Sequence, residues 1–366
     1  MILHILIDDK FSDYVIKQFS DEKLFSKFAF VTRSNQSVYF HFIDKTEVFD
    51  MSNSASMNDL LNECNRYESV VFHGLYYSWQ EWLIDNINDN VKIAWMFWGG
   101  EIYGQNDLLE TFLLPLSKKI FKIHRFIKPK NKKNFIISRK ILQKVDYCLT
   151  SVEEEYNFAK KYLSNDFIWL WYTYYTIEEV LGSLINKRCN GKSIWIGNAA
   201  TIENNFLDIF YRVKKIGVND RDIIVPLSYG TPWVKNITVK TGNLLFGKQF
   251  NPLLTFLPRE EYNSRMLDCS VMIQAHLRPH AHGNIITALW LGMRVYLYEN
   301  SIEYKFFKRL GLKVFSIEKD LVSKNSNKYN PLPEEDANYN QALLLAYYGK
   351  KNITNKIVAM SEVLNQ

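Results

Sequence analysis

Apolar and polar positions alternate along the first half of the chain in blocks that predict strands and helices in turn. Short apolar runs are typical of buried strands, and periodic segments such as 79–87 and 152–163 lie between them and predict amphipathic helices. Strands separated by helices predict a parallel sheet. The runs that predict strands are 2–7, 28–32, 37–43, 69–75, 91–96, 145–151 and 167–173.

A second series of the same kind starts near Ser193. Its apolar runs and helical segments again alternate over short connections, at 193–198, 222–230, 243–247, 254–258, 259–269, 270–275, 284–292, 294–300, 302–311 and 313–317. The pattern predicts an α/β protein with two Rossmann-like doubly wound domains facing a cleft, in which ligands bind outside the carboxyl ends of the strands.

The predicted domain limits follow the two series. We place a first domain at 1–185, a polar hinge at 182–192, a second domain at 190–345, and a C-terminal helix at 346–366 that is able to pack back on the first domain.

Size and composition agree with two globular domains. The chain has 366 residues, 47% of them hydrophobic and 15% aromatic, which excludes a disordered protein. The first eight residues are too short for a signal peptide, no apolar run reaches the length of a membrane span, and four scattered cysteines suit a reducing cytosol.

The stretch 193–206, SIWIGNAATIENNF, carries the first candidate site. A buried strand is followed by a loop that opens a helix, where backbone N–H groups and the helix dipole favour a phosphate. In this interpretation Gly197 permits close approach, Thr201 donates a hydroxyl, and Asn204 or Asn205 caps the helix. The alternative is a strand–turn–helix connection with an Asn cap and no ligand.

Several segments resemble, in the same order, the family of bacterial 4-acetamido-4,6-dideoxygalactose (Fuc4NAc) transferases of enterobacterial common antigen synthesis, glycosyltransferase family 56. The segment 196–206 resembles its Gly-Asn-Ser-like loop, 223–230 its strand ending in Pro-x-x-Tyr-Gly, and 256–307 its donor-binding half. WMFWGGEIY, 95–103, resembles its Trp-Gly-x-Asp-x-Tyr segment, with Glu101 where relatives often carry Asp.

The resemblance implies a GT-B fold, a dTDP-linked sugar donor and a polyprenyl-diphosphate-linked oligosaccharide acceptor, as in surface polysaccharide or O-antigen synthesis. It also implies that Glu299 holds the ribose of the donor; the alternative is that Glu299 and Asn300 cap a helix. The predicted donor-binding residues are Gly197, Asn198, Thr201, Asn204, Asn205, Ser228, Tyr229, Gly230, Arg278, Gly283, Asn284, Glu299 and Asn300.

Glu101 is the candidate catalytic residue. It follows a strand and the pair Gly99–Gly100, so we expect it to project into the cleft and to take the proton from an acceptor hydroxyl as a general base, which presumes inversion. The alternative is a solvated glutamate that caps a helix. The predicted acceptor-side residues are Asp9, Trp98, Gly99, Gly100 and Tyr103.

The segment HLRPHAHGN, 276–284, holds three of the seven histidines. Pro279 prevents a helix that would align His276 with His280, so a metal site is not expected; Arg278 or a histidine facing the donor diphosphate is the better interpretation. Asp220 and Asp222 form an Asp-x-Asp before a strand, which we interpret as a surface loop. The sequence therefore predicts neither a cofactor nor a required metal.

The positive charge of the chain is concentrated in one window. Between Glu110 and Asp146 there are 11 basic and no acidic residues; without them 34 basic and 39 acidic residues remain. The segment 118–144, placed in the first domain, interleaves this charge with apolar residues and predicts contact with an anionic membrane rather than nucleic acid. Lys118, Lys119, Lys122 and Arg125 are its candidate membrane residues; the alternative is a solvated basic face.

Together these features predict a peripheral glycosyltransferase on the cytoplasmic face of the inner membrane. It would move a Fuc4NAc-like deoxyamino sugar from a dTDP- or UDP-sugar to an undecaprenyl-diphosphate-linked glycan. The alternatives are an epimerase-like enzyme of the same fold, which would not need the basic window, and a non-catalytic module that binds lipid or glycan.

Overall fold

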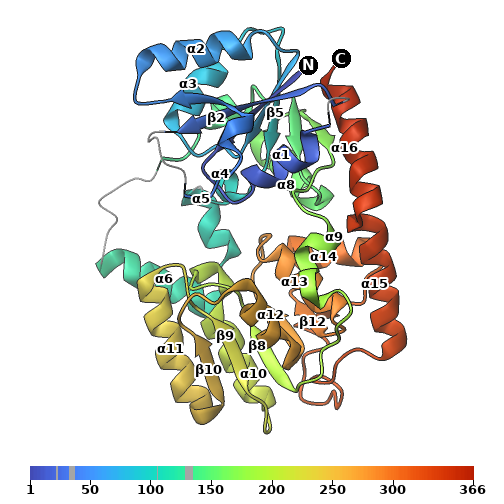
Figure 1. Cartoon of the computed structure of the whole chain (residues 1–366). Coiled ribbons are helices and arrows are strands. Elements are labelled where there is room, and N and C mark those ends of the chain that lie inside the picture. The colour runs from blue at the N-terminus through green and yellow to red at the C-terminus, as the bar shows by residue number, and fades with distance from the viewer. Residues whose placement is uncertain (22–23, 33–37, 105, 128–134) are drawn as a thin grey trace. The chain divides into compact units, whose positions relative to one another are not determined.

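The computed structural model of the chain describes residues 1–21, 24–32, 38–104, 106–127 and 135–366 (Figure 1). It divides into two compact units. Unit 1 comprises residues 1–105, 133–176 and 348–366, and unit 2 comprises residues 106–132 and 177–347.

Unit 1 contains a seven-stranded sheet in the order β3-β2-β1-β4-β5-β6-β7, in which every pair is parallel. Its strands are β1 (Ile2–Ile7), β2 (Ser26–Thr32), β3 (Glu47–Asp50), β4 (Ser69–His73), β5 (Lys92–Met96), β6 (Tyr147–Leu149) and β7 (Ile168–Leu170). Its helices are α1 (Ser12–Phe19), α2 (Ser54–Cys64), α3 (Ser78–Asn86), α4 (Gly100–Tyr103), α7 (Arg139–Leu142), α8 (Glu153–Leu163) and α16 (Lys350–Leu364), with a 3-10 turn at Ile43–Lys45.

Unit 2 contains a six-stranded parallel sheet in the order β10-β9-β8-β11-β12-β13. Its strands are β8 (Ser193–Ile196), β9 (Ile223–Pro226), β10 (Phe250–Leu253), β11 (Cys269–Gln274), β12 (Arg294–Leu297) and β13 (Phe315–Ser316). Its helices are α5 (Asn106–Leu109), α6 (Pro115–Ile127), α9 (Ile177–Leu181), α10 (Phe206–Ile216), α11 (Pro232–Phe246), α12 (Arg259–Leu267), α13 (His282–Trp290), α14 (Ile302–Arg309) and α15 (Glu334–Tyr348), with 3-10 turns at Glu110–Phe112, Gly182–Leu184, Ile202–Asn204 and Gly247–Gln249.

The central strands are apolar runs because helices cover both faces of each parallel sheet (Figure 1). Every residue of β1, β4 and β11 is buried. The two predicted parallel-sheet α/β domains are therefore confirmed.

The predicted strand at 37–43 is wrong within the described part, 38–43. Asp8 accepts hydrogen bonds from the backbone N–H groups of Val38 (2.8 Å), Tyr39 (2.8 Å) and Phe40 (3.1 Å), so these groups do not enter a sheet ladder. The strand that pairs with β2 is instead β3, four residues further along the chain from Ile43. A carboxylate on a distant loop thus decides the conformation of an apolar run.

The unit limits differ from the predicted domain limits in two places. The chain passes from unit 1 to unit 2 at Thr176–Ile177, before the polar hinge expected at 182–192. Residues 106–132, which contain α6, belong to unit 2, whereas the basic window was expected in the first domain. Residues 348–366 belong to unit 1, where the hydroxyl of Ser69 donates to the backbone oxygen of Leu364.

The side chains of Asn205 and Asp208 bind the segment 112–117, which leads into α6, to the rest of unit 2. The Asn205 side-chain oxygen accepts from the Leu114 N–H (2.8 Å), and its amide nitrogen donates to the backbone oxygens of Phe112 (3.2 Å) and Ala275 (2.9 Å). The Asp208 carboxylate accepts the N–H groups of Leu116 and Ser117, both at 2.9 Å, in the first turn of α6. A carboxylate at a helix N-terminus also stabilises the helix dipole.

Asn205→Ala should lower the free energy of unfolding by about 3 kcal/mol, because it leaves buried backbone groups of three segments without partners. Asn219→Ala is the matched control, since Asn219 is exposed and has a similar positive φ of 54° against 50° for Asn205. The control should cost about 1 kcal/mol, because alanine adopts a left-handed backbone less readily than asparagine. Urea unfolding of both variants measures the difference, and equal effects would contradict the role of the Asn205 amide.

Candidate functional site

Each sheet has one point where the strand order reverses, and the predicted site residues gather there. In unit 1 the reversal lies between β1 and β4, and in unit 2 between β8 and β11. Ligands of doubly wound sheets bind outside the carboxyl ends of the strands at such points. The segments that follow these strands are therefore the candidate ligand-binding segments of each unit.

In unit 2 the loop after β8 and the turn after β9 are joined by backbone hydrogen bonds. The Ala200 N–H donates to the Tyr229 oxygen (2.8 Å), and the Thr231 N–H donates to the Ala200 oxygen (2.7 Å). Gly230 has a φ of 114°, and a Cβ there would lie 2.5 Å from the Ala200 oxygen. Only glycine therefore allows the two loops to approach this closely.

Asn198 brings a third segment to the same place. His280, from the segment after β11, is hydrogen-bonded through Nδ1 to the Asn198 side-chain oxygen at 2.9 Å. Asn198 also forms a side-chain hydrogen bond with Tyr229, whose side chain is exposed. Burial lowers the pKa of His280 to about 3, so His280 is neutral and donates its Nδ1 proton to Asn198. Three of the predicted segments thus converge on one amide.

The paired asparagines do not cap the helix as expected. Asn205 is the first flanking residue of α10, but its side chain makes no cap hydrogen bond and binds the segments described above. The Asn204 amide donates to the Ala199 oxygen (2.9 Å) and to the Thr201 hydroxyl oxygen (3.0 Å). Both side chains are completely buried. They shape the loop from within, and their predicted contact with a donor stays a prediction.

Gly197 has a similar internal role. A Cβ at this position, which has a φ of 71°, would lie 2.5 Å from the ring of Phe206. The glycine therefore accommodates an aromatic ring of α10, and this contact alone accounts for the residue type.

Arg278 forms an ion pair that the sequence did not predict. Its Nη2 lies 3.1 Å from a carboxylate oxygen of Glu203, and both side chains are largely buried. Glu203 belongs to the 3-10 turn after the loop of Asn198. A diphosphate bound to Arg278 would therefore meet a guanidinium that already has an anionic partner.

The N-terminus of α13 carries further polar side chains. Ala281 precedes it with a φ of 57° and gives no side-chain cap. His282 Nδ1 lies 2.9 Å from the Glu303 carboxylate, which is fully buried, and Asn284 donates to the Tyr262 hydroxyl at 2.8 Å. The predicted Gly283 and Asn284 are half-buried here. Glu303 was missed because it lies within a helix, 21 residues from its histidine.

Glu299 and Asn300, after β12, do not cap the helix that follows, which was the alternative to a ribose-binding role. Ser301 caps α14 through the Tyr304 N–H (3.1 Å). The carboxylate of Glu299 lies 2.9 Å from Lys319 Nζ, and this lysine lowers the pKa of Glu299. Asn300 is exposed, and Ser228, after β9, is half-buried. The ribose-binding role of Glu299 stays a prediction.

Glu101 lies inside unit 1 and does not project from it, contrary to expectation. Its carboxylate is 2% exposed and accepts from the Leu75 N–H, the Tyr76 hydroxyl and the Trp95 indole, each at 3.2 Å. Burial raises the pKa of Glu101 to about 7, although the hydrogen bonds from the Trp95 indole and the Leu75 N–H oppose the shift. A carboxyl group with this pKa is able both to accept and to release a proton near neutral pH.

The other acceptor-side residues lie in the segments that follow β1 and β5, at the carboxyl edge of the same sheet. Gly99 has a φ of 94°, and a Cβ there would meet the buried ring of Tyr103 at 3.0 Å; a Cβ at Gly100 would meet the Tyr76 hydroxyl at 2.8 Å. The half-buried Asp9 accepts from the Phe11 N–H at 2.9 Å, and burial raises its pKa. Trp98 is half-buried and donates its indole N–H to the Tyr174 hydroxyl (2.6 Å).

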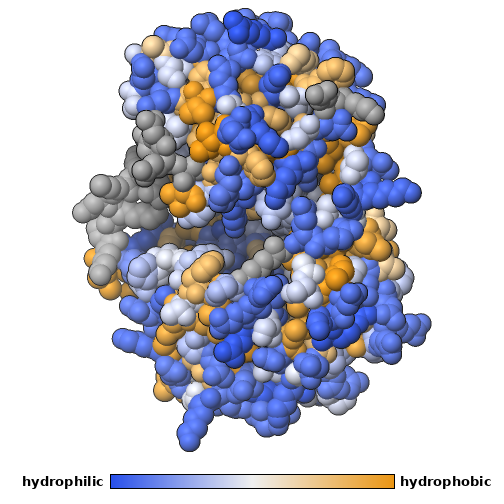
Figure 2. Space-filling model, in the orientation of Figure 1, coloured by the Kyte–Doolittle hydropathy of each residue, from blue (hydrophilic) through white to orange (hydrophobic). Residues whose placement is uncertain are grey.

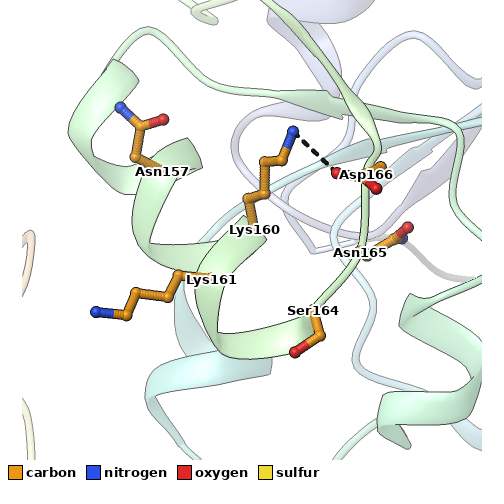
Figure 3. Close-up of a pocket in the computed structure, with 6 residues that line it drawn as sticks. All are labelled: Asn157, Lys160, Lys161, Ser164, Asn165 and Asp166. Carbon is orange, nitrogen blue, oxygen red and sulfur yellow. Dashed lines mark ion pairs between the residues drawn. The ribbon is translucent and has the colours of Figure 1, made fainter.

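Unit 1 has a surface pocket that does not include the predicted site residues. It is formed by the C-terminal end of α8 and the residues that follow (Figure 3). None of the predicted site residues lines it, and Lys160 is paired with Asp166 at 3.2 Å. Its lining residues are Asn157, Lys160, Lys161, Ser164, Asn165 and Asp166.

The basic window is divided between the two units. Four of its lysines, Lys128, Lys130, Lys132 and Lys133, lie outside the described residues. Helix α6, with Lys118, Lys119, Lys122 and Arg125, belongs to unit 2, whereas residues 139–144 belong to unit 1.

Helix α6 exposes apolar side chains beside its charges. Phe126 is 90% exposed, and Ile123 and Ile127 are also exposed. On the face shown in Figure 2 the surface is mostly hydrophilic, with hydrophobic residues in small groups. Lys122 and Arg125 lie 3.5 and 3.6 Å from the Glu110 carboxylate, so part of the positive charge is compensated. No helix among the described residues is long and apolar enough to cross a bilayer.

No three His, Cys, Asp or Glu side chains gather into a possible metal site within the part of the chain that the structure describes. Asp220, from the predicted surface loop, is exposed and pairs with Lys192. The three histidines of 276–284 bind backbone, amide and carboxylate partners instead.

Sequence comparison gives no match to a family model and no match to a curated protein. Comparison with solved structures gives full-length matches. A glycosyltransferase from Rickettsia africae ESF-5 matches with a TM-score of 0.64 at 10% identity, covering 99% of this chain and 98% of that one. HepE from Anabaena, in complex with UDP and glucose, matches at 0.62 and 8% identity over 99% of both chains.

A third match is the α,α-trehalose 6-phosphate synthase of Burkholderia multivorans, with a TM-score of 0.59 at 8% identity over 99% of this chain and 95% of that one. At such identities the likeness shows the fold alone. The two parallel-sheet units have the GT-B fold that the family resemblance implied.

The raised pKa of Glu101 makes stability depend on pH. The folded state holds this proton up to about pH 7, whereas an unfolded glutamate releases it near 4.5, so the free energy of unfolding falls as pH rises between these values. Glu101→Gln removes the effect. The stability of the Gln variant relative to the parent should therefore rise by about 3 kcal/mol between about pH 4 and about pH 8.

Urea unfolding across this pH range measures the difference. Glu362→Gln, at an exposed position of α16 in the same unit, is the matched control for the loss of one carboxyl group. A flat difference for Glu101→Gln would show that the buried carboxyl has an ordinary pKa.

Proposed function

We propose that this protein is a glycosyltransferase that moves a sugar from a nucleoside diphosphate sugar to a hydroxyl acceptor without a metal ion. The proposal is carried by one observation, the convergence of Asn198, Tyr229 and His280 at the strand reversal of unit 2. Donor and acceptor groups from three loops, beside Arg278 and the start of α13, suit a ligand with a base, a ribose and a diphosphate.

Similar structures support the donor class. HepE from Anabaena was solved in complex with UDP and glucose, and two other structures of the same fold are a trehalose 6-phosphate synthase and a sucrose-phosphate synthase. A nucleoside diphosphate sugar is the donor we propose for this chain, with thymidine or uridine as the base. Arg278 is proposed to stabilise the charge that develops on the leaving diphosphate.

Glu101 is proposed as the general base of an inverting transfer. The acceptor oxygen forms the new bond to the anomeric carbon, the bond to the diphosphate breaks, and Glu101 takes the hydroxyl proton. The acceptor hydroxyl must replace one of the donors that now bind the carboxylate. Tyr76 is the half-buried donor among them, and the Tyr76 hydroxyl is therefore the group we expect to give way.

We further propose that the sugar is Fuc4NAc-like and the acceptor an undecaprenyl-diphosphate-linked glycan at the cytoplasmic face of the inner membrane. The family resemblance of residues 95–103, 196–206 and 223–230 supports the sugar and the acceptor. Helix α6, with basic and exposed apolar side chains, supports the membrane.

Calorimetry with dTDP and UDP, without added metal, should show binding of at least one of them. Asn198→Ala should weaken that binding by about tenfold, the equivalent of one lost hydrogen-bonding group. Asn219→Ala, an exposed asparagine of the same unit, is the control and should bind like the parent. Absence of binding of both nucleotides, or a strict need for a divalent ion, would overturn the donor proposal.

The Glu101→Gln variant separates binding from transfer in the same experiment. Glu101 belongs to unit 1, so the variant should bind the nucleotide as the parent does. Its turnover should fall by about 100-fold or more, the usual contribution of a general base. Near-normal turnover would remove Glu101 from the mechanism while leaving the donor site intact.

Membrane attachment is tested by reversing the charge of α6. The parent should bind vesicles that contain anionic lipid, because each basic residue near such a surface contributes about 1 kcal/mol, and the binding should weaken with salt. Vesicle binding should be lost in the variant in which Lys118, Lys119, Lys122 and Arg125 become Glu. The control changes four exposed lysines elsewhere in unit 2 to Glu: Lys214, Lys215, Lys240 and Lys248. Equal binding by the α6 variant would make the window a solvated face.

A further inference from the structure

A continuous chain of hydrogen bonds runs through the sheet of unit 1, from its carboxyl edge to the start of β2. Trp98 Nε1 lies 2.6 Å from the Tyr174 hydroxyl, which lies 3.0 Å from His73 Nδ1. His73 Nε2 lies 3.0 Å from His4 Nδ1, and His4 Nε2 lies 3.3 Å from the Ser26 hydroxyl. Ser26 donates to the Leu24 oxygen at 3.3 Å.

The two ends of this chain fix its direction. An indole nitrogen only donates, and a backbone oxygen only accepts. Trp98 donates to the Tyr174 hydroxyl, which in turn donates to His73 Nδ1. His73 then donates its Nε2–H to His4 Nδ1, and His4 donates its Nε2–H to the Ser26 hydroxyl oxygen. In this direction every polar hydrogen of the chain has an acceptor. The opposite direction would leave the Leu24 oxygen without the serine proton. Both histidines are therefore assigned as neutral Nε2–H tautomers.

Burial makes this chain costly unless it is complete. His4 and His73 are fully buried; burial lowers the pKa of His4 to about 3 and holds that of His73 well below its usual value. A buried polar network with every member satisfied is rigid and specifies one arrangement of its side chains. Apolar residues would fill the same core at a lower cost. We therefore attribute the presence of these polar side chains to the residues that the hydrogen-bond chain positions.

The chain holds the aromatic side chains at the carboxyl edge. The Tyr174 ring is stacked on Phe11 with a centroid distance of 4.7 Å and an angle of 14°. Gln18 fixes the backbone at Tyr174 by donating to its oxygen at 3.0 Å. Trp98 packs edge-on against Phe11 at 5.4 Å and lies against Gly74, where a Cβ would be 3.0 Å from its ring. Phe11 and Trp98 remain half-buried at the surface.

The chemistry of this edge favours one class of ligand. The indole N–H of Trp98 is committed to Tyr174, so Trp98 has only its ring to offer a ligand. Asp9, close enough to influence Tyr174, offers carboxylate oxygens that accept hydrogen bonds. A pyranose ring presents both matching surfaces, an apolar face of C–H groups and a set of hydroxyl donors.

We propose that Phe11 and Trp98 form a stacking subsite for a sugar ring of the acceptor, and that Tyr174, His73 and His4 are positioning residues that hold Trp98 for it. The inference rests on the proposed transfer to a glycan. The subsite itself belongs to unit 1 and needs neither nucleotide nor turnover. It is therefore tested separately from the donor site.

The first test is a nitrogen-15 NMR measurement of the histidine rings in the parent protein. His4 and His73, assigned by single His→Gln variants, should both show the Nε2–H pattern and should not titrate between about pH 5 and 8. An Nδ1–H pattern or titration of either buried histidine would overturn the chain.

The second test follows Trp98 by fluorine-19 NMR of the protein labelled with 5-fluorotryptophan, its signal assigned with Trp98→Phe. A panel of methyl pyranosides at millimolar concentration should shift this signal, and Tyr174→Phe should weaken the best of them by about tenfold. Tyr156→Phe, which removes a hydroxyl bonded to the Phe167 oxygen in the same unit, should bind like the parent. If no pyranoside shifts the signal, or if Tyr174→Phe binds like the parent, the subsite or its positioning is wrong.

Discussion

The side-chain amide of Asn205 is the interaction on which the site of unit 2 depends. It is completely buried, and it joins the end of the Phe112 turn, the loop after β8 and the end of β11. A buried amide without partners would cost several kcal/mol, so these segments cannot separate independently. The loop of Asn198 is consequently held in place at the strand reversal, and α6 is held by the same residue.

The hydrogen bonds of Asn205 show which parts of the site were predictable from sequence and which were not. The strands β1, β4, β8 and β11 are plain apolar runs, and the residues after them lie where a parallel sheet places ligands, so the fold and the location of the candidate site followed from local patterns. The role of each side chain did not. Asn204 and Asn205 resemble a helix cap in sequence, yet their partners include segments up to 93 residues away. A local pattern carries no information about such partners.

The glycines also show that a local sequence pattern does not reveal which distant side chains lie beside a residue. In sequence, Gly197, Gly99 and Gly100 look like openings for a ligand. In the structure the space beside them is taken by the Phe206, Tyr103 and Tyr76 side chains. In a chain with 15% aromatic residues, a ring is a frequent neighbour for a missing Cβ. Glycine next to a strand end therefore indicates close packing at the carboxyl edge, and a ligand only where a second observation supports it.

The candidate general base, Glu101, and the candidate diphosphate ligand, Arg278, lie in different electrostatic environments. In unit 1 desolvation raises the pKa of the Glu101 carboxyl to about 7 and lowers the pKa of His4 and His73. In unit 2 burial likewise lowers the pKa of His276 and His280, but Arg278 keeps its charge beside the Glu203 carboxylate. A group that must accept a proton benefits from the first environment, because its pKa can approach neutrality. A group that must meet an anion benefits from the second, because a guanidinium keeps its charge when it exchanges one carboxylate for a diphosphate.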